Sequence, residues 1–341
     1  MSTSDCNVGA SKSKDDGVCE LNNKLQCMST ADVSICANCG KEDASNICNK
    51  CQVTKYCNAV CKKVHKKKHK KECQEHVRLA AEKHNEELKI AAELHDIELF
   101  KQPLPKDCPI CFLPLPLLLT GYKYQTCCGK RICSGCLHAP RYDNLGNEVD
   151  NQKCPFCRTP APPYSDEEIV KRNKKRAKVD DPIAIHNLGM YYSGGLNGYP
   201  QDIDKALELW HRAGELGHAH AYYNIGIAYL NGNDGVEVDI KKAAYNWELA
   251  AMRGSVTARH NLGVREARAG NMDRSLKHLM IAVGAGDNDS LERIKWLYTN
   301  GRTTKEDYAK ALQLFQTYLS EIKSPLRDKA AAFSEELYRY Y

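Results

Sequence analysis

The placement of cysteine constrains this chain more than any other feature of its sequence. All 18 cysteines lie at or before Cys157, and residues 158–341 contain none. The two parts of the chain must therefore be stabilised in different ways. Many of the cysteines form Cys-x-x-Cys pairs, and the polar N-terminus lacks the apolar core that a secretory signal needs. In such a chain this spacing favours bound metal over disulfides.

The apolar segments are too short for a membrane span. The longest apolar run, Ile110–Leu119, covers ten residues and contains two prolines. A membrane-crossing helix needs about 20 apolar residues, so we expect no membrane segment and an intracellular protein of the cytoplasm or nucleus. Residues 1–33 are polar and without periodicity, which predicts a disordered tail. Three cysteines of this tail have no Cys-x-x-Cys partner and are predicted to bind no metal: Cys6, Cys19 and Cys27.

The first cysteine array extends over residues 36–73 and has the spacing of metal ligands. Its eight candidate ligands are Cys36, Cys39, Cys48, Cys51, Cys57, Cys61, His69 and Cys73. Tetrahedral Zn²⁺ takes four ligands, so eight ligands supply two sites. His69 and Cys73 are one helical turn apart and can reach the same ion. His65 is the alternative histidine, and a disulfide knot is the alternative to metal.

This array resembles a MYND-type zinc finger, through Cys39-Gly40-Lys41 and Tyr56-Cys57 as well as through the ligand spacing. The resemblance implies interleaved sites and the binding of protein partners, commonly proline-containing peptides. Lys66 stands where the family usually has a tryptophan, which puts one packing or partner contact in doubt. The implied ligand sets are Cys36, Cys39, Cys57 and Cys61 for one zinc, and Cys48, Cys51, His69 and Cys73 for the other.

The second cysteine array lies between Cys108 and Cys157. Its pattern is Cys108-Pro-Ile-Cys111, then Cys127-Cys128-Gly-Lys-Arg-Ile-Cys133-Ser-Gly-Cys136, then Cys154-Pro-Phe-Cys157-Arg158. This pattern resembles a RING finger. The resemblance implies one zinc on Cys108, Cys111, Cys133 and Cys136, and a second on Cys154, Cys157 and two ligands from the middle segment.

The middle of the second array departs from the RING pattern. The family usually has a histidine where this chain has Lys130, and a lysine is protonated near neutral pH. The nearest fit is the all-cysteine RING of a deadenylase-associated ubiquitin ligase. The middle ligands would then be Cys127 and Cys128, which are adjacent here and would need a strained turn. His138 is the alternative to Cys127.

The RING resemblance also implies a function. Members of the family position a ubiquitin-charged conjugating enzyme and perform no covalent chemistry themselves. The residues that correspond to their contact surface are Ile110, Pro155 and, next to the donor ubiquitin, Arg158. The alternatives are that Ile110 and Pro155 only shape the zinc-binding turns, and that Arg158 is a surface arginine without a role.

Residues from Asp181 onwards repeat with a period of 37. Leu188-Gly189, Ile225-Gly226 and Leu262-Gly263 follow this period, as do Trp210 and Trp247. The pattern resembles Sel-1-like repeats, in which pairs of helices stack into an α/α solenoid. Copy three has Glu266 where a tyrosine belongs. A fourth copy begins near Ser290 and has Lys295 where the glycine belongs.

The sequence thus predicts a mostly α-helical protein in which small zinc-stabilised modules are joined by a helix to a solenoid. The helix is expected over Gln74–Leu99 and stopped by Pro103 and Pro105. The expected divisions are a tail at 1–33, a MYND-like finger at 34–73, a helical spacer at 74–103, a RING-like finger at 104–160, a basic linker at 161–180 that enters a helix near Asp166, about four Sel-1-like repeats at 181–324 and a terminal helix at 325–341.

The charge of the chain bears on its partners. The formal charge of +6 is dominated by Lys62–Lys71 and Lys171–Lys178. Fifteen thiolates bound to four Zn²⁺ would bring it to about −1, which weakens the case for general nucleic-acid binding. We expect a zinc-binding ubiquitin ligase whose partners are a conjugating enzyme and a protein substrate or adaptor. The alternatives are a non-catalytic adaptor and a nucleic-acid-binding regulator, the latter resting only on the two lysine-rich clusters.

Overall fold

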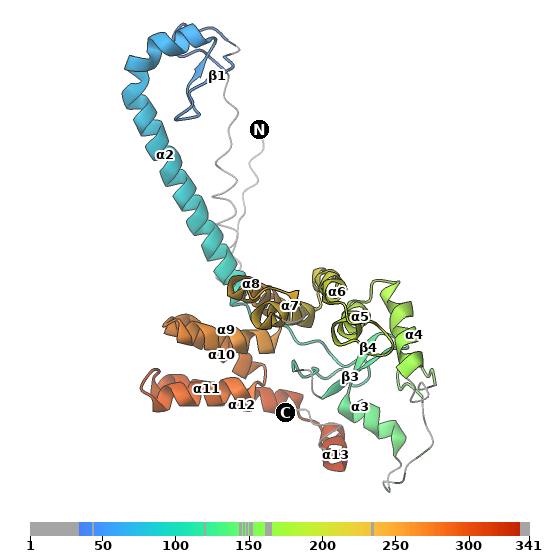
Figure 1. Ribbon diagram of the computed structural model, residues 1–341. Coiled ribbons are helices and arrows are strands. Elements are labelled where there is room, and N and C mark those ends of the chain that lie inside the picture. Colours follow the sequence, from blue (N-terminus) through green and yellow to red (C-terminus); the bar gives the residue numbers. More distant parts are fainter. Residues whose placement is uncertain are drawn as a thin grey trace, which may run out of the picture. The chain divides into compact units, whose positions relative to one another are not determined.

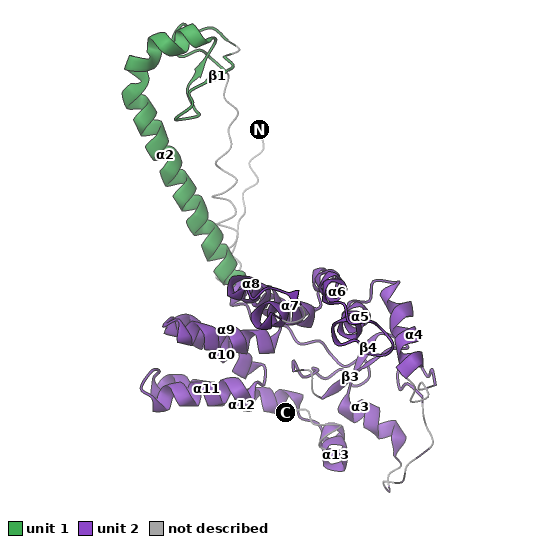
Figure 2. Ribbon diagram, in the orientation of Figure 1, with its two compact units in different colours: residues 1–98 green, residues 99–341 purple. Residues whose placement is uncertain are grey.

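The computed structural model describes residues 34–42, 44–118, 121–142, 145, 147, 149, 153–160, 166–232 and 235–334. The expected tail with Cys6, Cys19 and Cys27, and the end of the expected terminal helix, lie outside these residues. The chain divides into two compact units, Met1–Glu98 and Leu99–Tyr341 (Figures 1 and 2). The structure is mostly helical, with a cysteine-rich N-terminal module and stacked helix pairs, which confirms the predicted fold class. Within the described ranges, none of the helices combines the length and the apolar content that a bilayer crossing requires.

The N-terminal unit consists of a short hairpin and a long helix. Strands β1 (Asn46–Ile47) and β2 (Lys55–Tyr56) are antiparallel, with Asn46 opposite Tyr56. Helix α2 (Ala59–Leu99) ends where the sequence predicted, before Pro103. It begins earlier than predicted, because the Asn58 side chain accepts a hydrogen bond of 2.8 Å from the Cys61 amide and so caps its first turn. The first turns of α2 therefore carry ligand candidates of the first array.

The C-terminal unit combines the second array with the helical repeats. The array contains a hairpin of β3 (Tyr122–Gln125) and β4 (Lys130–Cys133), followed by α3 (Ser134–His138) and the 3-10 helix η1 (Ala139–Arg141). Helices stack in sequence order along the rest of the unit, as Figure 1 shows. They are α4 (Asp166–Ala177), α5 (Pro182–Gly194), α6 (Ile203–Glu215), α7 (Ala219–Asn231), α8 (Ile240–Met252), α9 (Val256–Arg268), α10 (Met272–Gly284), α11 (Asn288–Thr299), α12 (Lys305–Ile322) and α13 (Pro325–Phe333).

The repeated glycine and tryptophan explain how each helix pair packs. A Cβ added to Gly189 on α5 would lie 2.5 Å from Nε1 of Trp210 on α6, so only glycine admits the indole there. Gly226 and Trp247 repeat this contact one copy later. Trp210 and Trp247 are both buried, and they join the main apolar core of the unit. The 37-residue period of the sequence is thus the period of one buried glycine–tryptophan contact.

The third copy has a shorter turn between its two helices. In the first two copies the Asp202 amide donates to the Tyr192 carbonyl and the Asp239 amide to the Tyr229 carbonyl, both at 2.9 Å. In the third, the Asn271 amide donates to the Glu266 carbonyl at the same distance, over five residues instead of ten. Leu279 takes the position of the tryptophan against Gly263. The same backbone bond therefore closes turns of different length.

Residues 99–118, which lead from the end of α2 into the second array, run along the repeats, and two buried arginines hold their backbone. Arg259, 1% exposed, donates to the carbonyl oxygens of Leu99 at 2.6 Å and Lys101 at 2.7 Å. Arg327, 0% exposed, donates to the Pro114 carbonyl at 2.9 Å. The leucines Leu117 and Leu118 pack against Val256, Ala282 and Ala285 of α9 and α10. Residues 99–118 are thus bound along the helical repeats by hydrogen bonds and by apolar packing.

The second array also contacts the repeats at both ends of its hairpin and helix. The Tyr124 hydroxyl of β3 donates to Asp181 at 2.8 Å, and Asp181 in turn caps α5 and accepts from Arg176. A Cβ on Gly135 of α3 would lie 2.8 Å from the Arg327 amide of α13, so the two helices meet closely. The segment expected as a basic linker forms α4, whose buried residues Val170, Asn173 and Ala177 pack it against α5.

Candidate metal centres

The Cys-x-x-Cys pair of Cys133 and Cys136 leads into α3, and the other four such pairs adopt the same turn. In each, the amide of the residue after the second cysteine donates to the carbonyl of the first cysteine at 2.9 Å. That following residue has a positive φ, which tightens the turn and aims both sulfur atoms to one side. The four following residues are Gly40 (φ 74°), Gln52 (φ 56°), Phe112 (φ 58°) and Arg158 (φ 62°).

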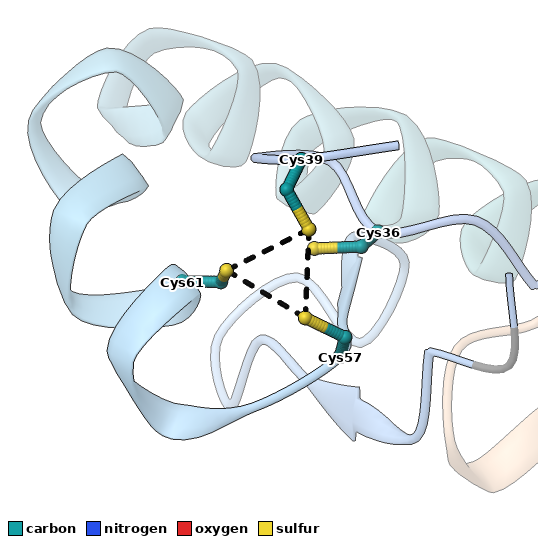
Figure 3. A group of neighbouring side chains, drawn as sticks. All are labelled: Cys36, Cys39, Cys57 and Cys61. Atoms are coloured by element: carbon teal, nitrogen blue, oxygen red, sulfur yellow. Dashed lines mark hydrogen bonds between the residues drawn. The ribbon is translucent and has the colours of Figure 1, made fainter. Parts of the chain in front are cut away.

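The first cluster joins the turn at Cys36 to the start of α2 (Figure 3). The sulfur atoms of Cys39 and Cys57 are 3.6 Å apart, those of Cys57 and Cys61 are 3.6 Å apart, and those of Cys61 and Cys39 are 3.8 Å apart. The Cys36 sulfur completes the cluster, and all four sulfur atoms lie within 4.8 Å of one another. These separations are those of four thiolates around one tetrahedral ion.

The second cluster brings the turn at Cys48 onto the next turns of α2. The sulfur atoms of Cys48 and Cys73 are 3.7 Å apart, and Nε2 of His69 is 3.5 Å from the Cys51 sulfur. His69 is buried. The alternative histidine, His65, directs its Nδ1 to the Tyr56 hydroxyl at 3.4 Å and is not in the cluster. The geometry therefore brings His69, and not His65, to the three cysteines.

The third cluster connects the turn at Cys108 with the end of β4 and with α3. It consists of Cys108, Cys111, Cys133 and Cys136, and the sulfur atoms of Cys111 and Cys133 are 3.8 Å apart. Strand β4 ends at Cys133, and Cys136 follows on α3 one turn later. Three of the four residues are buried, and they form one apolar cluster with Ile132 and Leu115.

The fourth cluster contains both adjacent cysteines of the middle segment. The sulfur atoms of Cys127 and Cys157 are 3.4 Å apart, and those of Cys128 and Cys154 are 3.9 Å apart. The turn that allows this ends at Gly129, whose φ is 73° and whose amide donates to the Gln125 carbonyl at 2.7 Å. His138 is not in the cluster; its ring stacks with that of Tyr142 at 4.5 Å. The structure therefore brings Cys127 to the site.

Each cluster holds one cysteine with a low pKa, which suits a cation. Burial raises the pKa of Cys51, but the backbone N–H groups of Thr54 and Val53 outweigh it and bring the pKa to about 5. By the same balance of burial and N–H donors the pKa of Cys36 falls to about 6. In the second array, the hydrogen bond from the Cys133 thiol lowers the pKa of Cys108 to about 4, and the Thr159 hydroxyl and N–H group overcome burial to bring that of Cys157 to about 6.

Other thiols of the clusters have raised pKa values. The hydrogen bond with Cys39 raises the pKa of Cys57 to about 12, and burial raises that of Cys73 to about 11. At least one thiolate per cluster thus forms near neutral pH, and the thiols with raised pKa values ionise only when a cation balances the added charge. This set of donors, sulfur with one imidazole, fits Zn²⁺.

Both arrays have interleaved ligands. In the first array, the first and third pairs form one cluster and the second and fourth pairs form the other. The second array repeats this order, because Cys108 and Cys111 meet Cys133 and Cys136 while Cys127 and Cys128 meet Cys154 and Cys157. The candidate contact residues lie on its first and last turns: Ile110 and Pro155 are partly exposed, and Arg158 is exposed.

The two buried arginines, Arg259 and Arg327, were not predicted from the sequence. Arg259 occupies the position of Ile185 in the first copy and Tyr222 in the second, both of them buried. A charged residue at a buried apolar position of the repeat predicts that polar groups from elsewhere in the chain hydrogen-bond to it. Arg259 could have been identified in this way.

Comparisons with known proteins agree with two of the three modules. Residues 36–73 match the family model of the MYND finger, and residues 182–218, 219–255 and 296–317 match that of the Sel1 repeat. These ranges leave out the copy with the shortened turn. No curated protein matches the chain. The resemblance of residues 104–160 to a RING finger stays a prediction.

Several solved structures resemble part of the chain. A Sel1 repeat protein from Oxalobacter formigenes is 26% identical, with a TM-score of 0.40, over 46% of this chain and 65% of that one. The protective antigen c5321 of uropathogenic Escherichia coli, which has the SLR fold, is 25% identical, with a TM-score of 0.37, over 50% of this chain and 37% of that one. The immunity protein Pa5087 of Pseudomonas aeruginosa is 23% identical, with a TM-score of 0.33, over 51% and 64%.

The chain thus spans less than two thirds of the length of each of these proteins. Its MYND finger implies bound zinc, and its two kinds of module are typical of proteins that bind other proteins. The chain carries a MYND finger at residues 36–73 and Sel1 repeats in its C-terminal unit.

Proposed function

We propose that this protein recruits a ubiquitin-charged conjugating enzyme through its second cysteine array, while the MYND finger and the repeats bind the protein to be modified. The observation that carries the proposal is the interleaved order of the four ligand pairs in residues 108–157. This order places the turn with Ile110 and the turn with Pro155 at different metal clusters of one small module. It therefore supports a rigid surface formed by both turns.

The proposed mechanism is one of positioning. Ile110 and Pro155 offer apolar contacts to the conjugating enzyme, and the Arg158 guanidinium offers hydrogen bonds to ubiquitin. Zinc, when bound, supplies rigidity to the turns and takes no part in the transfer. Ubiquitin that is linked to its carrier by a thioester is mobile, and holding it in a reactive pose lowers the entropic part of the barrier.

We also propose four Zn²⁺ per chain, one for each cluster of four ligands. Native mass spectrometry of the intact protein should count four ions. A count of three that stays at three in Cys127→Ser would identify the fourth cluster as incomplete. A count of two would mean that one array holds no metal.

A non-catalytic adaptor is the second candidate. It is favoured by the contacts of the second array with the repeats, in which Tyr124 meets Asp181 and Gly135 meets α13. In this alternative, the second array has a structural role: it stabilises the helical repeats and does not bind a conjugating enzyme. Lys130, in place of the histidine of the RING pattern, agrees with this alternative.

Ubiquitin discharge from a panel of conjugating enzymes separates the two candidates. We expect the zinc-loaded full chain to accelerate discharge with at least one enzyme. Ile110→Ala should weaken binding of that enzyme, while Arg158→Ala should leave binding unchanged and slow discharge. Leu104→Ala is the matched control, because Leu104 is an apolar residue of the same segment that is 85% exposed. If the zinc-loaded protein neither binds nor accelerates any enzyme of the panel, the adaptor replaces the ligase.

A further inference from the structure

Helix α2 has two parts with different charge. Its later turns carry both signs, and Arg78 pairs with Glu75 and Glu82 while Lys83 pairs with Glu87. Its first turns carry seven lysines between Lys62 and Lys71 and no carboxylate before Glu72. A helix surface that needs only to be soluble can use mixed charges, as the later turns of this helix do. The first turns have a different charge pattern, which calls for a different explanation.

Four of these lysines form one continuous stripe. Lys63, Lys66, Lys67 and Lys70 follow the i, i+3, i+4, i+7 spacing of a single helix face, and all four are exposed. Among the residues that the structure describes, no carboxylate lies within 4.0 Å of their ammonium groups, and the one acidic residue nearby, Glu72, pairs with His69. Like charges at this spacing repel one another and destabilise a helix.

The zinc clusters hold the stripe in place and account for only part of its charge. Cys61, His69 and Cys73 lie on the same turns of α2 as the lysines, so the metal clusters fix this part of the helix. Two Zn²⁺ on seven thiolates and one imidazole leave about three negative charges. The seven lysines carry seven positive charges, so about four positive charges remain after the negative charge of the two zinc clusters is subtracted.

Four of the six basic residues in the other basic run of the chain have a partner within the fold. On α4, Lys171 and Arg172 pair with Glu168, Arg176 pairs with Asp181, and the Lys174 ammonium lies 4.9 Å from the centre of the Tyr199 ring. The two basic runs therefore differ. On α2, Lys62 donates to the Ile47 carbonyl and to the Asn49 side chain. The four stripe lysines carry their charges without a carboxylate partner among the described residues.

We propose that the stripe Lys63–Lys66–Lys67–Lys70 binds the phosphate backbone of a nucleic-acid duplex, independently of base sequence. Lysine is depleted at protein–protein interfaces, where arginine and aromatic residues are enriched, and the stripe contains neither. A lysine ammonium is a compact point charge that suits phosphate, and four along one helix face can follow a row of phosphates. This contact is additional to the proposed ubiquitin function and does not depend on it.

The test measures binding of the zinc-loaded full chain to a 20-base-pair DNA duplex and a matching RNA duplex, by fluorescence anisotropy over a series of NaCl concentrations. The wild type should bind at least one of them with strong salt dependence. The variant K63Q/K66Q/K67Q/K70Q should lose at least about tenfold in affinity at low salt. Its plot of log K against log [NaCl] should become shallower by about 3 to 4, because each lost phosphate contact removes about 0.9.

Matched variants control for net charge and for folding. K171Q/K174Q/K175Q/K178Q removes the same number of charges from α4 and should keep the wild-type slope. K63R/K66R/K67R/K70R should restore binding, and zinc content should equal that of the wild type in every variant. The proposal is wrong if the wild type does not bind either duplex at 50 mM NaCl, or if the α2 and α4 variants behave alike. It is also wrong if poly-glutamate or phosphatidylserine vesicles bind the stripe as tightly as the duplexes.

Discussion

The first and second cysteine arrays use the same Cys-x-x-Cys turn and the same interleaved order, yet they differ in what surrounds them. The first is completed by α2, a helix that supplies Cys61, His69 and Cys73. The second belongs to one compact unit with the repeats, and buried arginines of the repeats hold the backbone beside it. The comparison teaches that ligand spacing determines the turn, whereas long-range contacts determine how much of the protein depends on the metal.

The largest expected effect separates the two arrays by loss of a ligand. Cys108→Ser should lower the unfolding midpoint of the repeats by about 10 °C or more, because structural zinc contributes about 10–16 kcal/mol in small fingers and about 2–4 °C is lost per kcal/mol. Tryptophan fluorescence reports this directly, since Trp210, Trp247 and Trp296 all lie in the C-terminal unit. Cys36→Ser should leave that midpoint unchanged. If both variants lowered the unfolding midpoint of the repeats by the same amount, the stability of the repeats would not depend on the second array more than on the first.

A substitution of Arg259 tests the link between the second array and the solenoid without touching a ligand. Arg259→Met should destabilise the C-terminal unit by about 3–5 kcal/mol, because the carbonyl oxygens of Leu99, Lys101 and Ala251 lose their buried donor at about 1–3 kcal/mol each. Urea unfolding followed by tryptophan fluorescence measures it. Arg268→Met is the control, since Arg268 is exposed on the same helix. A loss below 1 kcal/mol would show that the segment is held in another way.

Acid should destabilise the C-terminal unit through its histidines. Burial lowers the pKa of His218 to about 3, with nearby His220, Arg131 and Lys106 acting in the same direction, and burial lowers that of His220 to about 4. Both values lie below the value of about 6.5 in the unfolded chain, so the stability is fully present above pH 6.5 and falls as the pH drops towards 4.

Each of these histidines should contribute about 2 kcal/mol to the loss between pH 7.5 and pH 5. Urea titrations at the two pH values measure it. His220→Gln should reduce the pH dependence only in part, because burial also lowers the pKa of the neighbouring His186 well below its usual value. His84→Gln, on the N-terminal unit, should leave the pH dependence unchanged. A pH dependence that is the same in all three proteins would assign the acid sensitivity to the thiol clusters instead.

The smallest effect concerns the positive-φ residue of each turn. A left-handed conformation costs a residue with a side chain about 1–2 kcal/mol, which glycine largely avoids. Phe112→Gly should therefore stabilise the repeats by about 0.5–1 kcal/mol, since Phe112 is 75% exposed and little packing is lost. Gln52→Gly should instead raise only the chelator concentration needed to unfold the first array. Thermal and chelator titrations distinguish these outcomes, and a destabilised Phe112→Gly would indicate a role for the exposed ring.

The sequence predicted what depends on short spacings. Each turn involves about four residues, so the joint use of Cys154 and Cys157 could be anticipated from their spacing, and the RING resemblance implied that Cys127 lies with them. The repeated glycine predicted the close approach of the second helix that Gly189 and Trp210 make. The docking of the second array could not, because Arg259 and Leu99 are 160 residues apart and Arg327 and Pro114 are 213 apart. Nor could the packing of α4, whose charges suggested a linker although Asp181 binds Arg176.

The hydrogen bond that closes each helix pair has a consequence for insertions and deletions. Because the amide of Asp202, Asp239 or Asn271 fixes the separation of the two helix ends, the number of residues between them can differ, as it does between the second and third copies. Natural variation in length should therefore accumulate at this point of the repeat, where a fixed-period search loses the register. The exposed residues of such a turn, Asn197 and Gly198 in the first copy, are therefore where a fluorophore or an epitope can be added to the solenoid.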